Sequence, residues 1–347
     1  MSIALLGLLS LGLLLPLFMG SDSSDSDEDS SATEPLDLTE IDGDSILGTE
    51  GDDTLNIDAR DGGFEGITLE TGAGNDLLNL SVTGPDDTPR DATWWWSQID
   101  MGEGDDTIDA SVELSHVQGG DGDDIMSFDH AGVSTIEGGA GNDLIEAPYI
   151  DETEIYGGEG DDTIRVEDAA GSIGTIRGGP GDDLIETGGP GDRGAGYFAS
   201  TYGDEGDDTI SYTSGDVSFF LASPNSIYGG EGADLFQVHF NEGLYSEETD
   251  PELSHDAIQP DGTYRFGVVD IEDFETGVDH IEIHADIAGD GYEITSARIE
   301  NGTQLIVRYE HETEPTRDLV ITAGAGLDWD DVTFVGDHIP PVLQPVA

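Results

Sequence analysis

Nine segments of this chain fit one frame, Gly-Gly-x-Gly-x-Asp-x-apolar-x, and this repetition limits the possible folds more than any other feature. The copies begin at residues 48, 71, 101, 119, 138, 157, 178, 203 and 229. The fourth position is Gly and the sixth is Asp in all nine copies. From residue 101 to residue 178 the copies follow one another every 18 to 21 residues. A nearly constant period of about 20 residues predicts a solenoid of stacked coils.

Apolar residues recur at two fixed places in each coil. The eighth position of the frame holds Leu55, Leu78, Ile108, Met126, Ile145, Ile164, Ile185, Ile210 and Phe236. Two residues before most copies lie Ile46, Leu69, Ile99, Val117, Ile136, Ile155, Ile176 and Ile227. Each coil is therefore predicted to have two short strands joined by the glycine turn, with one inward apolar residue on each strand. We predict an all-β fold over residues 45–238, a parallel β-roll or β-solenoid.

The glycine-aspartate turn has the composition of a site for a hard cation. Calcium takes six to eight oxygens at about 2.3–2.6 Å from carboxylates and carbonyls. Glycines let the turn direct several carbonyls to one side, and Asp at position six adds a charged ligand. Because one turn supplies too few oxygens, we expect each Ca²⁺ ion to lie between the turns of consecutive coils. The predicted ligating residues of the central copies are Gly104, Asp106, Gly120, Gly122, Asp124, Gly139, Gly141, Asp143, Gly158, Gly160, Asp162, Gly179, Gly181 and Asp183.

The outer copies supply four further candidate metal ligands, Asp53, Asp76, Asp208 and Asp234. The best sites are expected between Met101 and Asp183. Copies in which Thr49, Thr71, Met101 or Asp204 replaces a motif glycine are expected to bind calcium more weakly or to act as caps.

The frame resembles the nonapeptide of the RTX (repeats-in-toxin, haemolysin-type) calcium-binding family, and the resemblance covers Gly48 to Gln237. It implies a parallel β-roll that binds several Ca²⁺ ions, folds on meeting calcium outside the cell, and leaves the cell by type I secretion. Similar proteins usually carry tandem nonapeptides with metal on both sides of the roll. Here the motif occurs about once per coil, so we expect metal turns along one side and plain turns along the other.

The charge of the chain fits a cation-binding role and excludes others. There are 78 Asp and Glu residues against nine basic residues, all Arg, and the net charge is −69. Nucleic-acid binding needs clustered Lys and Arg, so it is excluded, and docking on anionic lipid is disfavoured. Such a charge opposes a compact state by self-repulsion. We therefore predict a chain that stays loose at the low calcium of the cell interior and folds at millimolar calcium outside.

Both ends of the chain differ from the repeats. Residues 1–20 include an apolar run from Ile3 to Met19, which is an export signal, a membrane anchor or a leader without structural consequence. Residues 21–44 form an acidic linker predicted to be disordered. Residues 239–347 are predicted to form a β-rich cap, because an open solenoid end exposes core and unpaired strand edges. Within them, the segment from Asp273 to Ile281 is similar to an element that often closes RTX rolls.

Motifs for catalysis are absent from the sequence. It contains no His-Glu-x-x-His and no Gly-x-Ser-x-Gly, and without Lys there is no phosphate-binding Walker loop. His280, Glu282 and His284 would share one face of a strand, as a transition-metal site or as a solvated surface. Trp94, Trp95 and Trp96 are either a platform for stacking sugars or a plug on the early coils.

Three hypotheses for function follow. The first is a secreted or surface calcium-binding protein with a structural or adhesive role, whose partners are calcium ions and a cell-surface or matrix polysaccharide. The second is an extracellular polysaccharide-active enzyme, a lyase or epimerase, built on the roll. The third is a protein anchored to the cell through residues 3–19. The missing catalytic motifs and the lack of room for a separate catalytic domain favour the first.

Overall fold

The structure, a computed structural model, describes ten stretches of the chain. They are residues 45–58, 66–81, 94–95, 97–167, 174–188, 200–214, 225–240, 260–284, 293–313 and 316–336. All belong to one unit, Pro35–Ala347. The apolar run at residues 3–19 and the acidic linker lie outside the described residues. Within these ten stretches, no helix has both the length and the apolar character needed to cross a membrane.

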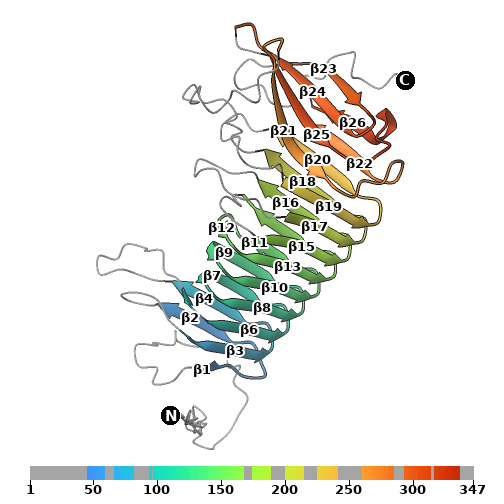
Figure 1. Cartoon of the computed structure of the whole chain (residues 1–347). Helices are drawn as coiled ribbons and strands as arrows, with labels where there is room; N and C mark the ends of the chain where they lie inside the picture. The colour runs from blue at the N-terminus through green and yellow to red at the C-terminus, as the bar shows by residue number, and fades with distance from the viewer. Residues whose placement is uncertain are drawn as a thin grey trace, which may run out of the picture. The chain divides into compact units, whose positions relative to one another are not determined.

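The described residues form two long sheets of mostly parallel strands (Figure 1). The first sheet contains, in order of pairing, β1 (Ser45–Leu47), β3 (Thr68–Ala73), β6 (Gln98–Glu103), β8 (His116–Asp121), β10 (Thr135–Ala140), β13 (Glu154–Glu159), β15 (Thr175–Pro180), β17 (Ser200–Glu205), β19 (Asn225–Glu231), β21 (Tyr264–Ile271), β25 (Arg317–Thr322), β24 (Gln304–Glu310) and β23 (Glu293–Glu300). The second contains β2 (Thr54–Asp58), β4 (Leu77–Ser81), β7 (Thr107–Glu113), β9 (Ile125–Gly132), β11 (Leu144–Glu146), β14 (Thr163–Val166), β16 (Leu184–Gly188), β18 (Thr209–Ser214), β20 (Leu235–Phe240), β22 (His280–His284) and β26 (Val332–Val335). Two short strands pair beside this path, β5 (Trp94–Trp95) with β7 and β12 (Ile150–Asp151) with β9. The chain alternates between the sheets, one strand of each per coil, so the predicted all-β roll is confirmed.

The register of the strands confirms the two predicted apolar ladders. Ile136 of the first sheet pairs with Val117 on one side and Ile155 on the other, and all three are fully buried. In the second sheet Ile145 lies in the same way between Met126 and Ile164. The inward residues of both sheets form one continuous core. Burying one such side chain contributes roughly 1.5–3 kcal/mol, but it needs the neighbouring coils to cover it, so the roll is stable as a stack.

The C-terminal residues close one end of the stack, as the sequence predicts. Parallel pairing continues past the last glycine copy, since β21 pairs with β19 and β22 pairs with β20. The direction then changes, because β24 runs antiparallel to both β25 and β23. Leu305, Val307 and Tyr309 of β24 are buried in the common core. The antiparallel strands thus form the β-rich cap.

The turns opposite the glycine turns carry hydroxyl groups. The backbone N–H of Ser97 donates to the hydroxyl of Ser115, and that of Ser115 donates to the hydroxyl of Ser134, at 3.2 and 3.1 Å. The N–H of Ser134 donates in turn to Thr153. Neutral hydroxyls satisfy these backbone groups without a buried charge.

Replacing Val133 with Asn is expected to stabilise the roll by about 1 kcal/mol, because Val133 precedes one of these hydroxyl turns with a φ of 47°. A β-branched residue is strained at positive φ, whereas Asn tolerates it. The valine side chain is 42% exposed, so little burial is lost. Thermal unfolding in calcium would measure the gain. Ile125→Asn is the control, since Ile125 is 46% exposed but lies in β9 without positive φ. Equal or lower stability of V133N than of the parent would contradict the prediction.

Candidate metal centre

The position-six aspartates of successive coils form one hydrogen-bonded column, which we call the aspartate ladder. The backbone N–H of each aspartate donates to Oδ1 of the aspartate in the next coil, at 2.7–3.1 Å. The members are Asp53, Asp76, Asp106, Asp124, Asp143, Asp162, Asp183, Asp208, Asp234 and Asp279. All nine predicted aspartates are therefore brought together, and the Oδ1 atoms hold the turns in register.

The second carboxylate oxygen of the ladder has no such partner. Among the described residues, buried Oδ2 atoms without a hydrogen bond belong to Asp76, Asp106, Asp124, Asp143, Asp162, Asp183, Asp208 and Asp234. The carboxyl side chains are nearly inaccessible, with residue exposures of 1–2%. A buried carboxylate oxygen without a partner is strongly unfavourable unless a cation neutralises it. The eight oxygens form a row that would be stabilised by bound cations.

A first-position glycine lies directly beside six of these eight oxygens, because Thr71 and Met101 hold that position in the copies of Asp76 and Asp106. A Cβ atom added to Gly138 would lie 2.4 Å from Asp143 Oδ2 and 2.5 Å from the carbonyl oxygen of Gly157 in the next coil. The same two kinds of oxygen border Gly119, Gly157, Gly178 and Gly203 at 2.0–2.8 Å. Five gaps in the stack are thus lined by a carboxylate from one coil and a carbonyl from the next. This mixed donor set is the one that calcium prefers.

The predicted glycine ligands at positions two and four shape the turn. Gly139 and Gly141 have φ values of 127° and 133°, which other residues rarely adopt. A Cβ on either would lie 2.0 Å from a carbonyl oxygen of the preceding coil. The same conditions hold at Gly104, Gly120, Gly122, Gly158, Gly160, Gly179 and Gly181. These glycines allow consecutive coils to approach each other closely. The carbonyl that borders each gap belongs to the glycine at position one, and this glycine is not among the ligands predicted from the sequence.

The outer copies differ in how their gaps are filled. The Thr71 hydroxyl donates to the carbonyl oxygen of Met101, and both first-position side chains are fully buried. Gly203 instead leaves the gap beside Asp208 open, as in the central copies. Asp204 takes a φ of 87° in place of the second glycine. Gly48 borders the same two kinds of oxygen, but Asp53 Oδ2 already accepts the N–H of Thr49. The gaps bordered by a carbonyl and a carboxylate oxygen without a hydrogen bond therefore run from Gly119 to Gly203. The stronger binding expected between Met101 and Asp183 stays a prediction.

Burial raises the pKa of the ladder carboxyls, and neighbouring carboxylates add to the rise. The pKa is raised to about 6 for Asp106, Asp143 and Asp234, and to about 7 for Asp124, Asp162, Asp183 and Asp208. The N–H bond donated by the preceding coil works in the opposite direction but is outweighed. The ladder thus has a strong affinity for positive charge, either protons or a metal ion.

Two features of the site were missed in the sequence prediction. Asp279 extends the ladder by accepting the N–H of Asp234 at 3.1 Å. Its signal was present, because Gly277, Asp279 and Ile281 keep positions four, six and eight of the frame. Position five forms a second, exposed ladder, in which Asp123 accepts from Asn142 and Asn142 accepts from Asp161. These carboxylates lie beside the buried row and increase its negative potential.

The other singled-out residues lie apart from the ladder. His280, Glu282 and His284 share the half-buried face of β22, as expected of a strand. His284 contacts Glu282 at 2.7 Å and stacks on His239, whereas His280 pairs with Thr333. Among the described residues, no three His, Asp or Glu side chains are arranged to hold a metal ion. Trp94 and Trp95 form β5, which pairs with β7 in parallel. Trp96 lies outside the described residues.

Comparison with known families agrees with this geometry. The family model of the RTX calcium-binding nonapeptide repeat matches the chain in four copies, at residues 102–129, 130–147, 154–170 and 222–237. The chain carries RTX calcium-binding nonapeptide repeats. The copies of the frame beginning at 48, 71, 178 and 203 fall outside these matches, yet their aspartates, Asp53, Asp76, Asp183 and Asp208, occupy the same ladder. No curated protein sequence matches the chain.

The RTX turns of this chain fit calcium by their own chemistry. Asp143 Oδ2 is buried and lacks a hydrogen bond, the Gly157 carbonyl faces the same gap, and both are hard oxygen donors. The chain contains no Cys, so a thiolate site for a softer metal does not exist. Calcium held there would neutralise the carboxylates and join consecutive coils.

Proposed function

We propose that this protein is a secreted calcium-binding repeat protein whose roll folds as calcium fills the gaps between stacked turns, with a structural or adhesive role outside the cell. The observation that supports this most is the row of eight buried Oδ2 atoms without hydrogen-bond partners. No other arrangement in the described residues concentrates so much uncompensated charge in the core. A fold of this kind requires a cation that is abundant outside the cell.

Calorimetric titration of the metal-depleted protein tests the proposal directly. About five strong calcium sites per chain are expected, one for each gap bordered by Gly119, Gly138, Gly157, Gly178 or Gly203. Weaker sites are expected at the outer turns, where Thr71 and Met101 fill the first position. The Kd is expected to be on the order of 0.1 mM, in the range of extracellular calcium modules. Failure to bind calcium at millimolar concentration would refute the proposed function.

Gly138→Ala is expected to remove one strong site and to destabilise the calcium-loaded roll by about 1–3 kcal/mol, as overpacked sites do. The added methyl would lie within 2.5 Å of two oxygens that border the gap. The φ of Gly138 is not positive, so alanine adds no backbone strain there. Calcium stoichiometry by calorimetry is the measurement. Gly51→Ala is the matched control, because nothing lies within 4 Å of its added Cβ; an equal loss in both variants would contradict the assignment.

The cellular setting is part of the proposal. RTX repeats are typical of secreted proteins, and type I export is the route that the resemblance suggests. A matrix or cell-surface polysaccharide is the proposed partner of an adhesive roll, bridged through calcium because the chain itself is strongly negative. Anchoring through residues 3–19 is the alternative to release. Fractionation of producing cells distinguishes them: a soluble extracellular protein supports release, and recovery with the membranes supports an anchor.

A further inference from the structure

A column of aromatic and cationic side chains crosses the outer face of the first sheet. Its members, Tyr156, Arg177, Tyr202 and Tyr228, lie in register on the consecutive strands β13, β15, β17 and β19. All four alternate with buried residues and are half-buried at the surface. The rings of Tyr202 and Tyr228 are stacked, with centroids 4.6 Å apart and planes 7° from parallel.

The column already binds one cation, which belongs to the chain itself. The Arg177 guanidinium lies over the Tyr202 ring, 4.0 Å from its centroid. Arg177 Nη1 also donates to Asp204 Oδ1 at 2.6 Å. A flat cation is thus held by an aromatic face and a carboxylate together, a combination that suits guanidinium better than ammonium.

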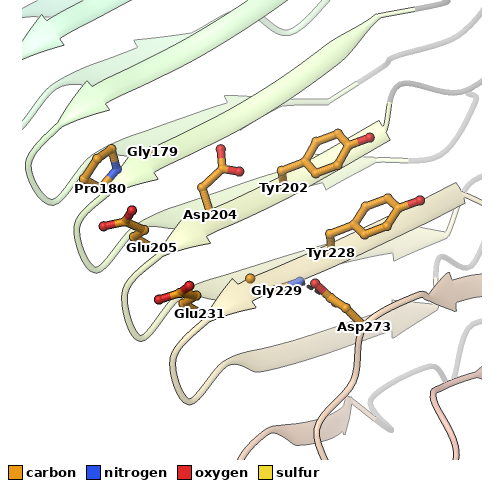
Figure 2. Close-up of a pocket in the computed structure, with 10 residues that line it drawn as sticks. Gly179, Pro180, Tyr202, Asp204, Glu205, Tyr228, Gly229, Glu231 and Asp273 are labelled. Carbon is orange, nitrogen blue, oxygen red and sulfur yellow. Dashed lines mark hydrogen bonds between the residues drawn. The ribbon is translucent and has the colours of Figure 1, made fainter.

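A pocket of about 510 Å³ lies beside this contact and offers the same chemistry again. Figure 2 shows Tyr202 and Tyr228 side by side on neighbouring strands, with Glu205 and Glu231 at the turn ends of these strands. Asp273 lies below Gly229 and accepts its N–H through Oδ1 at 2.9 Å. The lining residues include two tyrosines and four carboxylates, Asp204, Glu205, Glu231 and Asp273, and no Arg or His.

The charge of the pocket selects its occupant. An anionic ligand would be repelled, and so would a second copy of a chain with a net charge of −69. A calcium ion would use the carboxylates but gain nothing from the stacked rings. A guanidinium would use both, as Arg177 does over Tyr202.

We propose that this pocket binds an arginine side chain on a basic segment of a partner protein. The guanidinium packs against the Tyr228 side of the stacked pair and is neutralised by Glu231 and Asp273. The pocket adjoins the glycine turns, because Gly179 and Gly229 line it. An arginine held there would lie beside the calcium row, which maintains the fold of the roll.

The test is an NMR titration of the calcium-loaded protein at about 0.15 M salt with a blocked Gly-Arg-Gly-Arg-Gly peptide and its lysine counterpart. Tighter binding of the arginine peptide is expected, with resonances of Tyr202 and Tyr228 shifting. Tyr228→Leu is expected to weaken binding on the order of five-fold, the loss of one cation–π contact. Tyr156→Leu, in the same column but outside the pocket, should leave it unchanged.

A second comparison, of Glu231→Gln with Glu159→Gln, tests the carboxylates without altering the aromatic surface. Both glutamates are exposed at position three of their turns, but only Glu231 lines the pocket. Weaker arginine binding in E231Q alone supports the proposal. Equal binding of both peptides, or equal losses in the two glutamate variants, would show a general attraction to the acidic surface and overturn it. Loss of a calcium ion in E231Q without a change in peptide binding would identify a metal site and overturn it as well.

Discussion

Removing calcium at pH 7.5 is expected to convert the roll into an expanded, largely unfolded chain, and about 10 mM calcium is expected to restore it. The ladder carboxylates are buried in a single row, and the chain as a whole carries a charge of −69. Without a bound cation these charges repel one another inside the core. With a Kd on the order of 0.1 mM and about 10 mM calcium, each site contributes roughly 2.7 kcal/mol. Five such sites together contribute about 13 kcal/mol. This sum is comparable to the whole net stability of a usual domain, about 5–15 kcal/mol.

Far-UV circular dichroism and small-angle scattering in EGTA, then in calcium, would measure this transition. Magnesium at the same concentration is the first control, because it demands a smaller octahedral site and sheds water reluctantly. Sodium chloride at matched ionic strength is the second, since it screens charge without filling the gaps. An unchanged spectrum and radius of gyration in EGTA would show that the roll does not depend on calcium. Recovery with sodium chloride alone would assign the effect to screening.

The fold could be predicted from the sequence because every coil repeats the same pattern of apolar residues and turn glycines. Ile136 and Ile145 alternate with more exposed neighbours, and the glycine turn between them leaves few conformations open. A repeat of constant length then forces equivalent residues into register, as Ile136 with Ile155 and Ile145 with Ile164. The cap was predicted in outline from the need to cover an open end. Its antiparallel pairing depends on long-range contacts of β23, β24 and β25, which no local period encodes.

The sequence predicts the charged side chains of the site, but it predicts less well which backbone carbonyls border the gaps. Asp143 stands out in the sequence because its position is invariant across the repeats. The role of Gly138 depends on a distance to Asp143 and to Gly157 in another coil, and neither distance can be read from one copy of the frame. The pocket at Tyr228 was missed for the same reason. It joins β19 with Asp273, which lies 45 residues further along the chain than Tyr228.

Acidification is expected to stabilise the metal-free roll, so that protons partly replace calcium. The pKa values of seven ladder carboxyls are raised to about 6 or 7, mainly by burial, from an ordinary value of 3.8. A carboxyl whose folded pKa is raised binds its proton more tightly in the folded state. Its stabilising contribution is complete below pH 3.8 and is lost as the pH rises through 6 to 7. The metal-free roll is therefore expected to be least stable near pH 8 and to gain structure by pH 5.

Exhaustively demetallated protein is needed for the measurement, because EGTA loses affinity for calcium in acid. Thermal melts followed by circular dichroism between pH 4.5 and 8 would give the trend. Calcium binding near pH 6 should also release protons, which calorimetry detects as a dependence of the heat on the buffer. Metal-free stability that falls on acidification from pH 8 to pH 5 would contradict the raised pKa values.

Asp143→Asn separates the charge of the ladder from its hydrogen bonds. The amide oxygen can still accept the N–H of Asp124, but no carboxylate is buried at this position. At pH 8 the metal-free variant is expected to be more stable than the parent and to bind one calcium ion fewer. Asp161→Asn makes the same change of charge on the exposed fifth position and keeps its bond to Asp182. Since the buried charge at Asp143 both weakens the empty roll and holds the metal, the two effects should appear together in D143N and be absent from D161N.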